Sequence, residues 1–186
     1  MKTLIISLFV LLTPMCMIAQ QEDSLAKRYF EEEKMERDSI MQTIVGRAFA
    51  PFSATSLFGG KFSEQQLKDK ITIVNFWFKA CAPCIMEMPA LNDIYDHFQS
   101  NPNFQFISFT FDPNEVAQSV ARREKILFSI FPISRVECYR LNFDSGFPTT
   151  MIVNKEGGIV FYKMGGIRNS TQLEEIKEEL HKLLTP

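Results

Sequence analysis

Unbroken apolar runs mark the strands that this chain is expected to bury inside a sheet. Segments 71–78 and 104–111 are rich in β-branched and aromatic residues and carry no charge, a pattern typical of strands covered on both faces. Two shorter runs, 149–154 and 159–162, lie on either side of a Gly-Gly pair, and this arrangement predicts a hairpin. Residues 128–144 keep neither strand nor helix spacing for long, so we expect irregular structure there.

Helical spacing follows these strands. After the first strand, apolar residues recur at intervals of three and four positions: Cys84, Met88, Leu91, Tyr95 and Phe98. A second helix is expected after the second strand, with Asp112 as its cap, Pro113 in its first turn and Glu115 completing a capping box. Residues 172–184 form the last predicted helix.

The order of these elements indicates the fold class. Strand, helix, strand and helix are followed by two strands in a hairpin and by a final helix. Parallel strands joined by a helical crossover, together with an antiparallel hairpin, build a mixed central sheet flanked by helices. The sequence therefore predicts an α/β fold. Upstream, residues 51–62 are expected to be extended around a Gly-Gly turn, and residues 63–68 to form a short helix.

The N-terminus has the pattern of an export signal. In residues 1–19, one lysine precedes a short apolar run, and a small residue precedes a polar stretch, as in a secretory signal peptide. The run is shorter than the roughly 20 residues of a spanning helix, so a retained anchor is a weaker interpretation, as is a lipoprotein modified at Cys16. Residues 20–43 are highly charged and predict a solvated helical spacer rather than a dimerising coil. The globular domain is expected at 44–186.

Composition and charge exclude several classes of protein. With 186 residues, 46% hydrophobic and 23% charged, the chain suits one globular domain and is neither a disordered nor a polytopic membrane protein. The formal net charge is −2 and no basic cluster is present, so nucleic acid is not an expected partner. Eighteen phenylalanines against one tryptophan predict a core filled largely by phenylalanine.

Two cysteines stand where the first strand meets its helix. After removal of residues 1–19 the chain keeps Cys81, Cys84 and Cys138, too few for a disulfide scaffold. A cysteine at a helix N-terminus is a stabilised thiolate, because free N–H groups and the helix dipole favour its charge. Cys81 is therefore the expected attacking thiol, and Cys84, one turn further, the expected resolving thiol. Pro83 suits the first helical turn, where no N–H partner is needed.

The surroundings of this pair resemble a known family. Residues 74–84, VNFWFKACAPC, are similar to the active-site segment of the thioredoxin superfamily, in its TlpA/ResA-like exported branch. Pro89 stands where the family kinks its active-site helix, 146–150 resembles its cis-proline loop, and 46–62 resembles its extra N-terminal hairpin. The resemblance spans residues 44–186. It implies a thioredoxin-like fold with a mixed central sheet flanked by helices and an extra N-terminal β-hairpin.

The resemblance implies a role for each matching position around the cysteines. Pro148 is expected to be cis and to present the backbone of Phe147 to a substrate strand beside Cys81. Trp77 is expected to pack beneath the redox-active disulfide and to shield it. Ala82 and Pro83, between the two cysteines, are expected to meet the substrate.

The resemblance implies that Glu87 transfers the proton of the resolving thiol. Thioredoxins carry a buried aspartate at the position of Asn75, and an amide cannot carry that proton. Glu87, three residues after Cys84, matches the acidic residue of ResA-like proteins, and burial near a thiol would raise its pKa. Ala80 departs from the family, since many relatives have an aromatic residue there, and its small side chain opens the rim of the site.

The activity that the resemblance implies is thiol–disulfide exchange. We expect an exported enzyme of cell redox homeostasis, in the periplasm or elsewhere in the cell envelope, that reduces disulfides of client proteins such as apocytochrome c. A membrane thiol reductase would supply its electrons. A monomer without organic cofactor or metal is implied as well. The residues alone do not decide between reductant and oxidant, which differ by small shifts in thiolate stability.

Other interpretations stay open. A thiol-dependent peroxidase of the AhpC/TSA type would need a Thr-x-x-Cys and an arginine partner, and neither is evident. A non-enzymatic metal-binding thioredoxin-like module usually carries C-x-x-x-C and a later histidine. A purely structural disulfide would close a very short loop. A zinc site would need ligands from Cys138, His97 or His181, and like the structural disulfide it leaves Trp77 unexplained.

Overall fold

The computed structural model describes residues 25, 27–29, 31–32, 35, 38–167 and 169–185. The chain divides into two compact units, Met1–Gln42 and Thr43–Pro186. The predicted signal peptide, 1–19, lies outside the described residues, and those described in the predicted spacer, 20–43, are helical. Within the described part of the chain, no helix combines the length and apolar character needed to cross a membrane.

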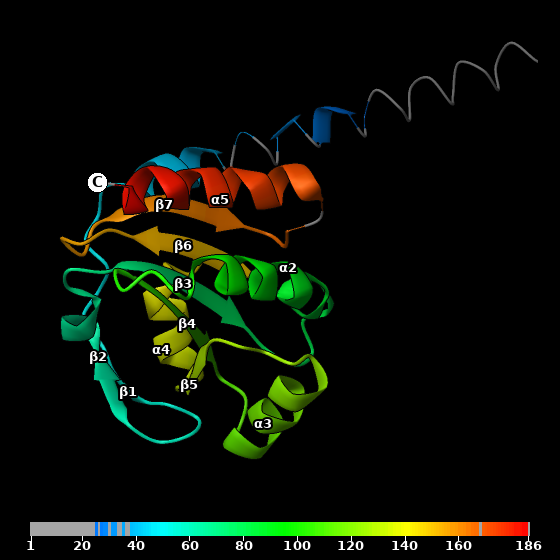
Figure 1. Cartoon of the computed structure of the whole chain (residues 1–186). Helices are drawn as coiled ribbons and strands as arrows, with labels where there is room; N and C mark the ends of the chain where they lie inside the picture. Colours follow the sequence, from blue (N-terminus) through cyan, green and yellow to red (C-terminus); the bar gives the residue numbers. More distant parts are fainter. Residues whose placement is uncertain are drawn as a thin grey trace, which may run out of the picture. The chain divides into compact units, whose positions relative to one another are not determined.

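Five strands form the central sheet of the second unit, in the order β5-β4-β3-β6-β7 (Figure 1). They are β3 (Ile71–Trp77), β4 (Phe104–Thr110), β5 (Ser129–Pro132), β6 (Thr149–Val153) and β7 (Ile159–Met164). β4 is parallel to β3 and β5, whereas β6 is antiparallel to β3 and β7. The predicted mixed sheet is confirmed, and β3 at its centre is buried at every residue.

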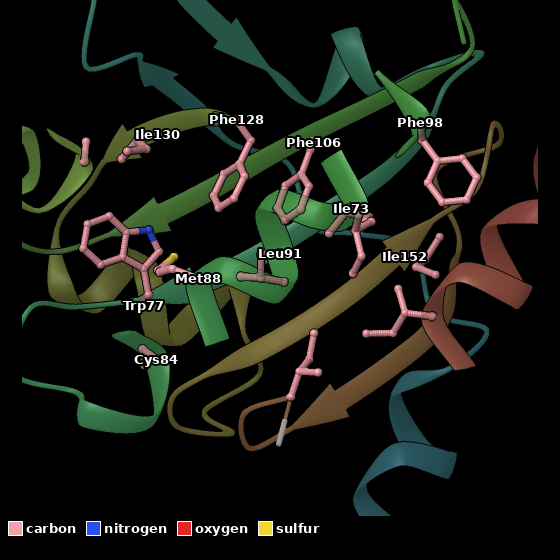
Figure 2. Packing of buried hydrophobic residues seen from close by; sticks show 14 of the residues in the cluster. Ile73, Trp77, Cys84, Met88, Leu91, Phe98, Phe106, Phe128, Ile130 and Ile152 are labelled. Carbon is pink, nitrogen blue, oxygen red and sulfur yellow. The ribbon is translucent and has the colours of Figure 1, made fainter. Parts of the chain in front are cut away.

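Helices cover both faces of this sheet. They are the 3-10 helix η1 (Glu64–Leu67) and the α-helices α2 (Ala82–Phe98), α3 (Asn114–Arg123), α4 (Arg135–Leu141) and α5 (Ser170–Leu184). Buried side chains of α2, α3 and α5 join one apolar cluster with Ile73 and Trp77 of β3 (Figure 2). Side chains alternate along a strand, so Phe76 points to the other face, where it stacks on Phe109.

A small hairpin lies against this second face. It consists of β1 (Ser53–Thr55) and β2 (Lys61–Ser63), which pair antiparallel. Phe52 packs edge-on against Phe109 of β4, and Phe62 lies against Phe131 of β5 with ring centroids 5.0 Å apart. Both glycines of its turn have positive φ, which glycine adopts at little cost. The predicted N-terminal β-hairpin is thus confirmed.

The prediction of irregular structure at residues 128–144 is wrong, because this segment contains β5 and α4. β5 has four residues and lies at the edge of the sheet, and α4 has seven residues. Neither element is long enough to show a clear period in the sequence. Cys138 and Leu141 of α4 are buried, and the helix contacts β4.

The predicted capping of α3 by Asp112 is also wrong. Pro113 occupies the cap position, and no side chain caps this helix. The carboxylate of Asp112 instead accepts hydrogen bonds from the backbone N–H of Lys79, at 2.6 Å, and from the hydroxyl of Thr110, at 3.2 Å. The carboxylate of Asp112 therefore binds the loop that leads to Cys81, and it does not cap the helix as the sequence predicted.

Leu91 tests the apolar cluster between α2 and the sheet. Its side chain is fully buried (Figure 2), so Leu91→Ala leaves a cavity and is expected to lower the free energy of unfolding by about 2–5 kcal/mol. Urea denaturation measures this change. The control is Met86→Ala on the same helix, where the side chain is 79% exposed and the expected change is within about 0.5 kcal/mol. Equal stabilities of the two variants would contradict the described packing.

Candidate active site

A disulfide joins Cys81 and Cys84 at the start of α2, with an S–S distance of 1.97 Å and a Cα–Cα distance of 5.2 Å. Cys81 is the cap residue of the helix, and its sulfur accepts a hydrogen bond from the backbone N–H of Cys84 at 3.3 Å. Cys81 is 6% exposed, whereas Cys84 is fully buried. An incoming sulfur atom therefore reaches Cys81 and not Cys84.

The residues on either side of Cys81 are exposed. Ala82 and Pro83, the first residues of α2, are exposed, as are Lys79 and Ala80 before the cysteine. Pro83 lies where the helix leaves its first N–H groups unpaired, so its missing donor costs nothing. The predicted substrate-facing residues Ala82 and Pro83 are thus open to solvent.

The predicted cis-proline loop lies against the start of α2. The Phe147–Pro148 peptide bond is cis, as predicted, and the carbonyl oxygen of Pro148 accepts a hydrogen bond from the N–H of Gly165 at 2.9 Å. A Cβ atom on Gly166 would lie 3.1 Å from the carbonyl oxygen of Pro83 and 3.7 Å from Cγ of Pro148. A side chain at 166 would therefore require the carbonyl group of Pro83 to move by a few tenths of an ångström.

An aromatic cluster, formed by Phe78, Phe111, Tyr139 and Phe147, adjoins this loop. The ring centroid of Phe147 lies 5.2 Å from that of Phe78 and 5.4 Å from those of Phe111 and Tyr139. The carbonyl oxygen of Phe78 accepts a hydrogen bond from the N–H of Cys81, which links the cluster to the disulfide. The sequence analysis missed all of its members except Phe147, since they come from four separate segments.

Trp77 lies in the same buried apolar cluster as the two cysteines. It is fully buried, and its indole N–H donates a hydrogen bond to the hydroxyl of Ser108 at 3.1 Å. Figure 2 shows Trp77 beside Met88 and close to Cys84. Met88 belongs to the same cluster, and the shielding of the disulfide by the indole stays a prediction.

Glu87 places a carboxyl group inside the apolar cluster, one turn after Cys84. Its side chain is 1% exposed. One carboxyl oxygen accepts a hydrogen bond from the amide of Asn75 at 3.0 Å, and the other accepts one from the N–H of Ile167 at 3.0 Å. Burial raises the pKa of Glu87 to about 7, although these hydrogen bonds and the positive charge of Lys163 oppose the shift. The predicted increase in the pKa of this carboxyl is confirmed.

The partners of Glu87 come from a row across the sheet. Asn75 of β3 pairs with Thr150 of β6, and Thr150 pairs with Lys163 of β7. The Asn75 amide nitrogen also donates to the Thr150 hydroxyl at 3.0 Å. The sequence analysis did not find Thr150, Lys163 or Ile167, because strand register aligns Asn75, Thr150 and Lys163, and the segment after β7 brings the N–H of Ile167 to the carboxyl.

Cys138 belongs to a different part of the domain. It is a free thiol buried on α4. Burial raises its pKa to about 12, and the negative charges of Glu137 and Asp112 act in the same direction, so it stays protonated at neutral pH. Among the described residues, no group of three or more histidine, cysteine or acidic side chains could hold a metal ion.

Comparison with known sequences agrees with this site. A family model described as "AhpC/TSA family" matches residues 45–162. The "Thiol-disulfide oxidoreductase ResA" of Bacillus thuringiensis subsp. konkukian (strain 97-27) is 26% identical over 159 residues, which cover 84% of this chain and 86% of the relative. The predicted resemblance to ResA-like proteins is therefore confirmed.

Solved structures share the fold. A "thiol:disulfide interchange protein, thioredoxin family protein" from Chlorobium tepidum TLS superposes with a TM-score of 0.63 at 20% identity, over 75% of this chain and 97% of its own. StoA from Bacillus subtilis superposes with a TM-score of 0.58 at 25% identity, over 70% of this chain and 96% of its own. The predicted thioredoxin-like fold is thus confirmed. Because its family model spans most of the domain that carries the disulfide, the chain belongs to the AhpC/TSA family and is similar, within it, to thiol–disulfide oxidoreductases of the ResA type.

Proposed function

We propose that this chain reduces disulfides in client proteins of the cell envelope through a dithiol–disulfide cycle of Cys81 and Cys84. The observation that carries the proposal is the disulfide itself, since it lies at a helix N-terminus with one accessible and one buried sulfur. Such a position stabilises a thiolate on Cys81, the more accessible cysteine, and protects Cys84 from solvent.

The cycle starts from the reduced dithiol. The Cys81 thiolate attacks one sulfur of a client disulfide, forms a mixed disulfide and releases the other client sulfur as a thiolate. The Cys84 sulfur, after losing its proton, then attacks Cys81 and releases the second client thiolate. Two electrons pass to the client, and the Cys81–Cys84 disulfide remains. A dithiol donor, for which we propose a membrane thiol reductase, must return two electrons and two protons.

Glu87 is suited to carry the proton of Cys84. The two residues are three positions apart on α2, so their side chains lie on one face of the helix. A carboxyl group with a pKa of about 7 is present in both protonation states near neutral pH. It can therefore accept the proton of Cys84 and later return it to a leaving thiolate. Asn75 positions this carboxyl and carries no proton itself.

The client segment is proposed to bind along the cis-proline loop. The backbone of Phe147 would pair with an extended client segment, while Ala82 and Pro83 would contact it from the helix side. The exposure of Ala82 and Pro83 supports this proposal, as does the aromatic cluster that packs around Phe147. Small groups at Ala80 and Ala82 leave room for a client backbone beside Cys81.

The proposal also includes export by the N-terminal segment to the periplasm or cell envelope. The protein would be a monomer there, with apocytochrome c as one client. The pattern of residues 1–19 supports export. A thiol-dependent peroxidase of the AhpC/TSA type is less well supported, because Phe78 stands three positions before Cys81 in place of a threonine. A metal-delivery module is disfavoured because Phe147, and not a histidine, stands before Pro148.

Mixed-disulfide trapping tests the order of attack. We expect reduced Cys84→Ser protein to accumulate a covalent adduct with a disulfide-containing protein such as insulin, because the resolving sulfur is missing. Non-reducing electrophoresis and mass spectrometry detect the adduct, and dithiothreitol should release it. Cys81→Ser is the matched control and should form no comparable adduct, because Cys84 is fully buried. An adduct confined to the control would reverse the assigned roles, and adducts with neither variant would rule out the cycle.

The proton role of Glu87 requires that this carboxyl titrate near neutral pH in the folded protein. Its pKa is raised from 4.5 to about 7, so the folded state retains the proton where the unfolded state has lost it. The resulting stabilisation is complete below pH 4.5 and is lost as the pH rises through 7. The free energy of unfolding of the wild type, minus that of Glu87→Gln, should therefore fall by roughly 3 kcal/mol between about pH 4 and pH 8.

Urea denaturation of both oxidised proteins across this pH range measures the difference. Glutamine keeps the size of the side chain and one of its two accepting oxygens. The other carboxyl groups are the same in both proteins, so the subtraction removes their contribution. A difference that is independent of pH would show that Glu87 does not titrate in this range and could not carry the proton.

A further inference from the structure

Two histidines far apart in the sequence meet on the surface of the domain. His97 lies in the last turn of α2 and His181 in the last turn of α5, and both are exposed. Their Nε2 atoms are 3.2 Å apart, and their rings are nearly perpendicular, at 87°. Each position alone is explained by a favourable charge at a helix C-terminus, but that effect does not account for two facing nitrogen atoms.

A phenylalanine at the edge of the core packs against both imidazole rings. The ring of Phe98, which is 5% exposed, packs against His97 with centroids 4.6 Å apart and against His181 with centroids 4.9 Å apart. Phe98 in turn packs against Phe104 at the start of β4. The two side chains are therefore preorganised by the edge of the core.

The contact between the two helices does not depend on the histidines. One turn earlier on each helix, Asp93 and Lys177 form an ion pair of 2.7 Å. Leu91 and Ile94 of α2, together with Ile176 and Leu180 of α5, belong to the same buried cluster. The histidine pair is thus available for a ligand without breaking the packing of α2 on α5.

The spacing of the two nitrogen atoms matches a shared metal ion. Two imidazole nitrogens bound to one tetrahedral zinc ion, each at about 2.0–2.1 Å, lie about 3.3–3.4 Å apart. Imidazole is also a preferred ligand of Zn²⁺. We infer that His97 and His181 form a surface site for Zn²⁺ or a similar divalent transition-metal ion, with water or a small anion in the remaining positions.

Metal binding here requires a change of tautomer and a rotation of the two exposed rings, so that both Nε2 lone pairs converge on the ion. In the ion-free pair, one neutral ring donates its Nε2–H to the Nε2 lone pair of the other. When the ion binds, that hydrogen moves to Nδ1 of the donor ring, and both Nε2 lone pairs coordinate the metal. No redox change is involved, and the ion bridges the C-terminal ends of α2 and α5. This site is separate from Cys81 and Cys84 and does not depend on the proposed function.

Zinc titration of the full chain without an affinity tag tests the site. The protein is kept oxidised, so that Cys81 and Cys84 cannot bind the ion. Isothermal titration calorimetry with ZnCl₂ in a non-chelating buffer at about pH 7.5 should show one site per chain. The thermal midpoint of unfolding should rise with Zn²⁺ concentration, because the ion binds the folded state only.

Single variants assign the ligands. His97→Gln and His181→Gln should each weaken Zn²⁺ binding by at least about tenfold, since even the loss of an outer partner of a metal ligand costs that much. Both side chains are exposed, so the variants should keep the fold, which circular dichroism checks. Asp93→Asn is the matched control: it breaks the neighbouring ion pair between the same helices and should leave zinc affinity unchanged.

Three results would overturn the inference. The wild type could show neither heat nor a rise in thermal midpoint in excess Zn²⁺. The histidine variants could bind with wild-type affinity, which would assign the ion to another site. Asp93→Asn could weaken binding as strongly as the histidine variants, which would make the effect one of helix packing.

Discussion

A single buried carboxyl group organises the site, because it must be hydrogen-bonded where water cannot reach it. Glu87 is almost fully buried and takes one hydrogen bond from Asn75 of β3 and one from the N–H of Ile167, after β7. Asn75 also donates to Thr150 of β6. The first turns of α2 are therefore tied to both central strands and to the segment after the hairpin. Burial disfavours the charged form of the carboxyl and raises its pKa to about 7. A pKa near neutral pH suits a group that transfers protons.

The same constraint shapes the surface beside the disulfide. With the start of α2 fixed, Gly166 fits against the carbonyl oxygen of Pro83, and the cis-proline loop lies next to it. In the apolar cluster that also contains Trp77, Cys84 has no exposure and Cys81 keeps a small one. The asymmetry between the two sulfur atoms thus follows from packing, and it is what separates an attacking from a resolving cysteine.

The features that could be predicted from the sequence are those determined by residues close together in the chain. Strands β3 and β4 and the C-x-x-C at a strand–helix junction could be predicted from continuous segments, whereas the burial of Glu87 was expected only from the resemblance to ResA-like proteins. β5 and α4 could not be predicted, since each is too short to show a period. Asp112 was misassigned because a residue 33 positions earlier, Lys79, competes for its carboxylate. The row from Asn75 to Lys163 depends on strand register, and the contact between His97 and His181 spans 84 positions.

The reduction potential of the Cys81–Cys84 couple tests the central claim most directly, because it reports how strongly the site favours the dithiol or the disulfide. It is measured by equilibrating the protein with a series of dithiothreitol or glutathione buffers. A reductant of client disulfides is expected at about −220 mV or below. A value near about −120 mV would make the protein a disulfide donor, and the absence of a reversible two-electron couple would contradict the oxidoreductase account.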